Sequence, residues 1–149
     1  MSPGKASIEF TVTGGSYCHH GCDGPPSVNV VDSAGHGLEL GSNCYTDCRS
    51  CSISGCPPGP CSQDGIVTGA NLNWDGSYLA TSTCGPGTSC LEPAVAPPGK
   101  YTATFCATPG KLMGPDGGFQ QCVPSGPAKC ASVKFDFPSS TVVKGTVGP

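Results

Sequence analysis

The sequence predicts one all-β domain over residues 1–149, a disulfide-rich β-sandwich, and three observations lead to this prediction. The chain has 12 cysteines, an even number, which suits a fold that cross-links stabilise. Leu, Ile, Val and Phe together number only 25, so burial alone is a weak source of stability. Short stretches of alternating apolar and polar residues recur between breaks rich in glycine and proline, and none has helical periodicity.

The first part of the chain predicts three short strands. Residues 7–13 alternate apolar and polar side chains, as a half-buried strand does, and a glycine pair ends the stretch. Two further stretches flank a Ser-Ala-Gly turn, with valines before it and leucines after it, and therefore predict a hairpin. They span residues 27–32 and 38–40.

Residues 43–64 differ in composition from the stretches around them. They hold five cysteines and a tandem proline pair, but almost no aliphatic residue. Such a segment cannot supply core, so we expect an inserted loop that disulfides knot together. Because five is an odd number, at least one of these cysteines pairs outside the insertion. The five are Cys44, Cys48, Cys51, Cys56 and Cys61.

The second half of the chain predicts four more strands, of which residues 100–107 are the clearest. There Tyr101, Ala103 and Phe105 alternate with threonines, directly after a Pro-Pro-Gly turn. The other three begin near Ile66, Tyr78 and Val133. Residues 141–147 are a fifth and last candidate strand. The core is expected to hold Ile8, Phe10, Val12, Val28, Val30, Trp74, Tyr101, Phe105, Phe135 and Phe137.

Two segments of the second half are expected to be loops. Residues 84–90 have a cysteine at each end and three glycines or prolines between them, so we expect a small loop closed by a Cys84–Cys90 disulfide. Residues 108–130 are poor in aliphatic residues and predict a long loop that carries Cys122.

The second half also has a recognisable order of motifs. Trp74-Asp75-Gly76 is followed by Pro97-Pro98-Gly99-Lys100-Tyr101 and then by residues 133–138. This order resembles small bacterial immunoglobulin-like β-sandwiches of the FlgD type and of the BsuPI proteinase-inhibitor type. The cysteines of this half and residues 105–110 also resemble uncharacterised cysteine-rich lipoproteins of myxobacteria. The resemblance covers about residues 66–140 and implies an immunoglobulin-like sandwich in which Trp74 and Tyr101 are buried.

Composition and charge exclude several classes of partner. The seven basic residues are scattered and the net charge is −3, so there is no basic cluster for nucleic acid. No apolar run approaches the roughly 20 residues that cross a bilayer as a helix, so we expect no transmembrane segment. The first five residues lack the apolar segment of a signal peptide, and we interpret them as the start of a mature chain with an added methionine.

Cysteine usage predicts an oxidising compartment. We expect a secreted, cell-surface or periplasmic protein in which all the cysteines form disulfides, and the lack of N-glycosylation sequons fits a bacterial source. Sequence does not choose among the many pairings of twelve cysteines. The twelve are Cys18, Cys22, Cys44, Cys48, Cys51, Cys56, Cys61, Cys84, Cys90, Cys106, Cys122 and Cys130.

One constellation offers metal ligands, namely Cys18, His19, His20 and Cys22. Thiolates and imidazoles are ligands for zinc or copper, but this spacing does not match the usual zinc pairs. Adjacent residues on a strand also point to opposite faces, so the two histidines cannot both chelate from a regular strand. We therefore favour a short Cys18–Cys22 disulfide, or cross-links to elsewhere in the chain, and expect no metal and no cofactor.

No catalytic set is visible in the sequence. The three histidines have no nucleophile motif beside them, and no pair of the ten acidic residues stands out. We therefore expect a non-catalytic module for surface recognition, or for structure or self-assembly at a cell surface, with an unidentified protein or surface partner. One alternative is a proteinase inhibitor of the BsuPI type that uses the loop at residues 84–90 or the tip at residues 57–60. The other alternative is a protein that binds metal through its cysteines and histidines.

Overall fold

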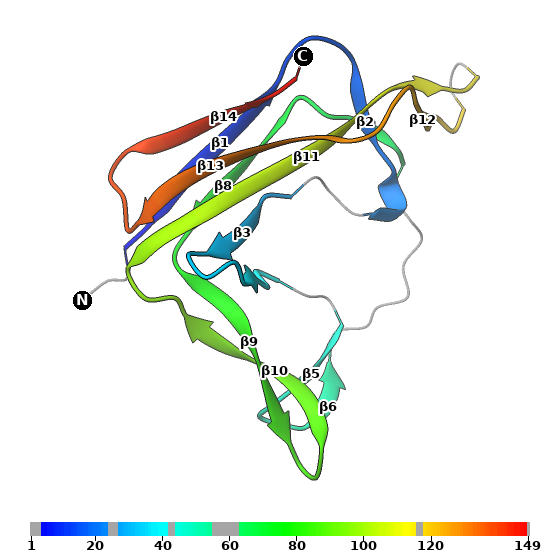
Figure 1. Cartoon of the computed structure of the whole chain (residues 1–149). Coiled ribbons are helices and arrows are strands. Elements are labelled where there is room, and N and C mark those ends of the chain that lie inside the picture. The colour runs from blue at the N-terminus through cyan, green and yellow to red at the C-terminus, as the bar shows by residue number, and fades with distance from the viewer. Residues whose placement is uncertain (1–3, 24–26, 42–43, 55–62, 116–117, 149) are drawn as a thin grey trace.

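The structure is a computed structural model that describes residues 4–23, 27–41, 44–54, 63–115 and 118–148. Its described part contains fourteen strands and one single-turn 3-10 helix, η1 (Gly21–Asp23), so the predicted all-β class is confirmed. The strands form three sheets, and Figure 1 shows two of them stacked along the long strand β11 while the third extends away from them.

The first sheet pairs the first strand of the described chain with its last strand. It has the order β14-β1-β8, formed by β14 (Val142–Val147), β1 (Ala6–Val12) and β8 (Gly69–Trp74). Strand β1 pairs in parallel with β14 and antiparallel with β8. The first predicted strand and the last are therefore confirmed, and they lie side by side although they are far apart in the sequence.

The second sheet is organised by β11 (Gly99–Met113), a strand of 15 residues. Its first half pairs with β13 (Lys129–Phe137) and with β3 (Asn29–Asp32). Its second half pairs with β2 (Tyr17–His19) and with β12 (Gln121–Pro124). Two short strands complete the sheet: β4 (Gly37–Leu38) next to β3, and β7 (Gly65–Ile66) next to β2.

The third sheet has the order β6-β5-β10-β9 and consists of two hairpins. One joins β9 (Ser77–Cys84) to β10 (Thr88–Val95), and the other joins β5 (Tyr45–Asp47) to β6 (Ser52–Ser54). The hairpins meet through a parallel bridge between Leu91 and Asp47. We call this sheet the tip sheet, because it projects at one end of the molecule in Figure 1.

The core lies between the first two sheets. Phe10 of β1 stacks on Phe105 of β11 with ring centroids 5.7 Å apart, and the indole of Trp74 contacts Tyr101 edge-on at 5.2 Å. Nine of the ten predicted core residues are buried, and Val12 is partly buried against the same cluster. Buried residues outside that prediction include Ala6, Tyr17, Val67, Ala96, Ala103, Ala107 and Val147.

The structure corrects both loop predictions of the second half. Residues 108–130 are not one long loop, because β11 continues to Met113 and turns back through β12, and β13 starts at Lys129. Residues 84–90 are not a closed ring but the turn of the β9–β10 hairpin with the ends of its two strands. Neither segment has a clear alternation of apolar and polar side chains, because few of its side chains are buried. Backbone pairing with neighbouring strands defines these strands instead.

The cysteine pairing also differs from the local pairs that the sequence favoured. The described disulfides are Cys18–Cys122, Cys48–Cys90, Cys51–Cys84 and Cys106–Cys130. The Cys84–Cys90 prediction is therefore wrong, because both cysteines bond to the turn between β5 and β6. Of the two alternatives for Cys18, a cross-link to elsewhere in the chain is confirmed and the Cys18–Cys22 bond is wrong, because Cys18 bonds to Cys122 on β12. Cys22 and Cys44 are disulfide-bonded as well. Cys56 and Cys61 lie outside the described residues.

We expect Phe105→Ala to destabilise the protein by about 3–5 kcal/mol, because the ring is fully buried and its removal leaves a cavity. The matched control is Phe119→Ala, where the same ring is 59% exposed, with an expected change below about 0.5 kcal/mol. Chemical denaturation of both variants checks this. Equal losses would contradict the assigned core.

Loss of the Cys18–Cys122 disulfide is expected to cost more than loss of Cys106–Cys130. The two bonds span 104 and 24 residues, and a longer closed loop constrains the unfolded chain more. We expect the Cys18→Ala/Cys122→Ala double variant to lose about 5 kcal/mol and the Cys106→Ala/Cys130→Ala double variant about 3–4 kcal/mol. Urea unfolding of both variants gives the comparison, and the reverse order would contradict it.

Candidate functional site

The four candidate metal ligands of the sequence analysis make different contacts in the structure. Cys18 on β2 is bonded to Cys122 on β12, and Cys22 in η1 is also oxidised. The Nδ1 atom of His19 is buried and has no hydrogen-bond partner in the described part of the chain. The imidazole of the fourth residue, His20, contacts a carboxylate. In the described ranges no group of three or more His, Cys, Asp or Glu side chains is placed to hold a metal.

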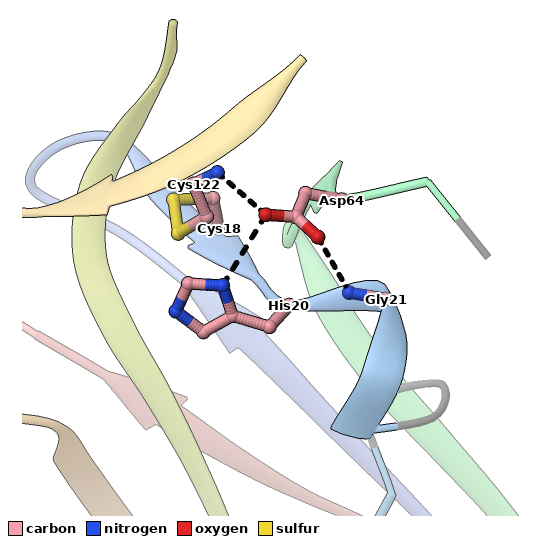
Figure 2. Close-up of polar contacts among 5 residues, drawn as sticks. All are labelled: Cys18, His20, Gly21, Asp64 and Cys122. Carbon is pink, nitrogen blue, oxygen red and sulfur yellow. Dashed lines mark hydrogen bonds and ion pairs between the residues drawn. A yellow bond between two sulfur atoms is a disulfide. The ribbon is translucent and has the colours of Figure 1, made fainter. Parts of the chain in front are cut away.

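That carboxylate belongs to Asp64, which connects three segments of the chain. Its Oδ1 accepts a hydrogen bond from the N–H of Gly21, and its Oδ2 accepts one from the N–H of Cys122, both at 2.7 Å. The Nδ1 of His20 lies 3.2 Å from the same Oδ2. Figure 2 shows this carboxylate between η1 and β12, next to the Cys18–Cys122 bond. Asp64 therefore fixes the start of η1 and strand β12 beside one disulfide.

The surroundings of Asp64 stabilise its charged form. Its side chain is only 11% exposed, while that of His20 is half exposed. Backbone donation from Cys122, and then from Gly21, holds the pKa of the Asp64 carboxyl below its ordinary value, and the His20 contact adds to this lowering. A carboxylate with a lowered pKa and all its contacts to structural groups acts as a clamp. It is not poised as a general acid or base at neutral pH.

A hollow on the outer face of the second sheet also lacks convergent chemistry. It has a volume of about 540 Å³ and lies over the outer face where β3, β11 and β13 meet. Both acidic side chains of its lining have partners. Lys100 donates to Asp136 at 3.0 Å. Asp32 accepts hydrogen bonds from the backbone of Ala34 and His36 within the β3–β4 turn. Lys134 is the remaining charged side chain of the lining.

The tip sheet is the second candidate site, and two disulfides hold it. Cys48 and Cys51 flank the turn between β5 and β6, and they bond to Cys90 and Cys84 on the other hairpin. Both hairpins are thereby joined near their turns, so neither hairpin can move without the other. The sequence predicts a knotted loop insertion here, but the described part of that segment is a hairpin rather than an irregular loop.

Local hydrogen bonds fix the turn of the β5–β6 hairpin. The N–H of Arg49 donates to Oδ1 of Asp47 at 2.9 Å, and its guanidinium Nη2 donates to Oδ2 at 3.2 Å. The N–H of Cys51 donates to the carbonyl of Asp47 at 2.7 Å, and Cys51 has a positive φ of 52°. The backbone N–H and the side chain of Arg49 hold the pKa of the Asp47 carboxyl below its ordinary value. These hydrogen bonds restrict the conformation of the turn.

The β9–β10 turn is equally restricted. It consists of Gly85, Pro86 and Gly87, with φ of 60° at the first glycine and 80° at the second. These angles lie in the left-handed region, which glycine adopts without strain. A turn of this kind is not the extended backbone that lies in a protease cleft, so this hairpin does not favour the inhibitor alternative. The proline-rich segment at residues 57–60, which the sequence analysis names as the other inhibitory loop, lies outside the described residues.

Most side chains of the tip sheet remain available at its surface. Among the described side chains of its four strands Cys90 is the one buried residue, and Ile53 is 69% exposed. The sheet therefore adds little to the core, yet it is tightly constrained. Sequence reasoning located the cysteines of this region but missed its strand pairing, and it missed Asp64 completely. A single Asp directly before the short strand β7 carries no signal of its own.

Comparisons of this chain with protein-family models, with curated proteins and with solved structures find no match. In the described part of the chain no helix is long and apolar enough to cross a bilayer. The four described disulfides are typical of proteins from an oxidising environment.

We expect Asp64→Asn to lower stability at neutral pH and to flatten its pH dependence. Because the folded pKa of Asp64 is lowered, its contribution is present above the unfolded pKa of about 4 and is lost as pH falls through the lower folded value. Thermal unfolding from pH 7 to pH 2 measures this in both proteins. Asp136→Asn is the control, because that carboxylate is largely exposed. A steeper acid loss in Asp64→Asn than in the wild type would contradict the clamp.

Proposed function

We propose that this chain is a non-catalytic, extracytoplasmic binding module whose recognition surface is the tip sheet. The observation that carries the proposal is that this sheet is rigid without being part of the core. Two disulfides replace apolar burial as its source of order, so its outward side chains are free for a partner. A surface that is ordered before binding loses less conformational entropy when the partner arrives.

The composition of the tip fits a protein or cell-surface partner. Its exposed side chains combine two large apolar residues, Ile53 and Val95, with Arg49 and a series of hydroxyl side chains on β9 and β10. Mixed apolar and polar contacts with an arginine are typical of protein interfaces. The disulfides support placement outside the cytoplasm, where such bonds persist. The proposal is therefore of a secreted or surface-exposed module.

The immunoglobulin-like assignment is part of the same proposal. In its support, the sheet β14-β1-β8 and the sheet built on β11 share one core. Trp74 and Tyr101, the two aromatic residues of the quoted motif, contact each other at its centre. Rigid β scaffolds with functional loops at one end host many binding activities, which is why the tip and not the fold carries the functional argument.

A pair of matched variants tests the binding surface. We expect Ile53→Glu to weaken binding of the labelled protein to intact cells, or to the extracellular fraction, of the source organism by at least about tenfold. Val142→Glu is the control, because Val142 is also an exposed apolar strand residue but lies on β14, outside the tip sheet. Equal binding by both variants, with both folded, would contradict the proposal.

Sedimentation of the purified protein addresses the structural alternative. If the module serves recognition, it stays monomeric at the concentrations used for binding. Large particles that Ile53→Glu disperses would instead make the partner another copy of the chain, and the tip would then serve assembly at a cell surface. Particles that Ile53→Glu leaves intact would locate assembly outside the tip.

A further inference from the structure

One disulfide lies on the outer face of the second sheet. Cys106 of β11 and Cys130 of β13 are directly opposite each other in the antiparallel register, and both are exposed. On the inner face of the same strand, the neighbours Phe105 and Ala107 are buried in the core. The sulfur atoms therefore lie on the solvent side of a sheet whose other side is packed.

The other three described disulfides are less accessible. Cys18 and Cys122 are 1% and 4% exposed, and a Cβ added to Gly110 would come within 3.1 Å of the Cys18 sulfur, so strand β11 covers that bond. In the tip sheet Cys90 is buried, Cys48 and Cys84 are half-buried, and Cys51 is exposed. Among the described bonds, only Cys106–Cys130 has both of its cysteines exposed. Attack by a thiolate needs access to a sulfur atom, so accessibility favours this bond.

We propose that Cys106–Cys130 is a thiol-exchange site that reacts with low-molecular-weight thiols while the rest of the molecule stays oxidised and folded. The thiolate of a small thiol attacks one sulfur, and the Cys106–Cys130 bond breaks as a mixed disulfide forms. The other cysteine leaves as a thiolate and takes a proton from water. A second small thiol then attacks the mixed disulfide, which gives the protein dithiol and one molecule of oxidised small thiol. Two electrons pass from the two small thiols to the protein disulfide.

The sheet does not depend on this bond for its pairing. Strands β11 and β13 are in register over nine residue pairs, from Gly99 with Phe137 to Ala107 with Lys129. On the outer face the hydroxyl groups of Thr104 and Ser132 are 2.8 Å apart, in the pair next to the disulfide. The inner face keeps its aromatic contacts. Reduction therefore opens a covalent site on a surface that remains folded.

The result of the exchange is a surface that carries either a disulfide, a mixed disulfide or two thiols. A mixed disulfide is a covalent attachment, so the same position can accept a small thiol or a cysteine-bearing peptide. The site lies on the second sheet rather than on the tip sheet, so this inference does not rest on the proposed binding function. Its occupancy follows the ratio of reduced to oxidised thiol in the surroundings.

Graded reduction of the wild-type protein tests this directly. The protein is equilibrated with buffers of increasing glutathione to oxidised-glutathione ratio, free thiols are trapped with an alkylating reagent, and labelled peptides are identified by mass spectrometry. We expect Cys106 and Cys130 to be labelled, or to carry glutathione, at a ratio of glutathione to oxidised glutathione about tenfold lower than the ratio that labels Cys18, Cys122, Cys48 or Cys90. Far-UV circular dichroism of the same samples stays unchanged at this step.

Two double variants test whether the first labelling event in the graded reduction belongs to Cys106–Cys130. We expect the Cys106→Ser/Cys130→Ser double variant to lack the labelling that the wild type shows at the lowest reducing ratio, and to keep the labelling at higher ratios. We expect the Cys51→Ser/Cys84→Ser double variant to keep the labelling of Cys106 and Cys130 at the lowest ratio. The proposal is overturned if another pair is labelled first, or if all the cysteines become reactive together with loss of β structure. Because the main readout uses the wild-type chain, failure of a variant to fold leaves the test intact.

Discussion

Strand β11 is the element on which the rest of the pairing depends. Its 15 residues bring β13, β3, β2 and β12 into one sheet, and its inner face supplies Tyr101, Ala103, Phe105 and Ala107 to the core. The alternation of side chains along one strand thus produces two faces with different chemistry. Phe105 packs against Phe10 of the opposite sheet, while the next residue, Cys106, projects to solvent and forms a covalent cross-link. Both the core contact and the proposed exchange site follow from the rule that successive side chains of a strand point to opposite faces of the sheet.

Apolar burial and disulfides stabilise different parts of this molecule. The aromatic cluster around Trp74 organises the end of the two stacked sheets where β8 ends and β11 begins, and the Asp64 clamp and Cys18–Cys122 secure β2, η1 and β12. The tip sheet has few buried side chains and relies on Cys48–Cys90 and Cys51–Cys84. A chain with few large aliphatic residues cannot build a second core, so cross-links are the physical means by which an exposed sheet stays ordered. That division leaves the tip surface available for the binding that we propose.

The parts of the fold that sequence predicts are those with local periodicity. Ile8 and Phe10, or Tyr101 and Phe105, alternate with polar residues, and this pattern placed the core strands correctly. The extension of β11 past residue 107 was missed because Pro109 and Gly110 resemble a break, although β2 and β12 pair with them. Disulfide partners were missed because sequence proximity suggested Cys84–Cys90, whereas both cysteines bond across the sheet to the β5–β6 turn. The role of Asp64 arises from backbone donors 43 and 58 residues away, which no local pattern encodes.

Disulfides between the two hairpins, and not within one of them, hold the tip sheet in the conformation that we propose for binding. Proteolytic digestion under non-reducing conditions, followed by mass spectrometry of the linked peptides, tests this pairing. We expect peptides that contain Cys48 bonded to Cys90 and Cys51 bonded to Cys84. A peptide in which Cys84 is bonded to Cys90, or free thiols at Cys48 and Cys51, would contradict it, because the two hairpins would then not be joined.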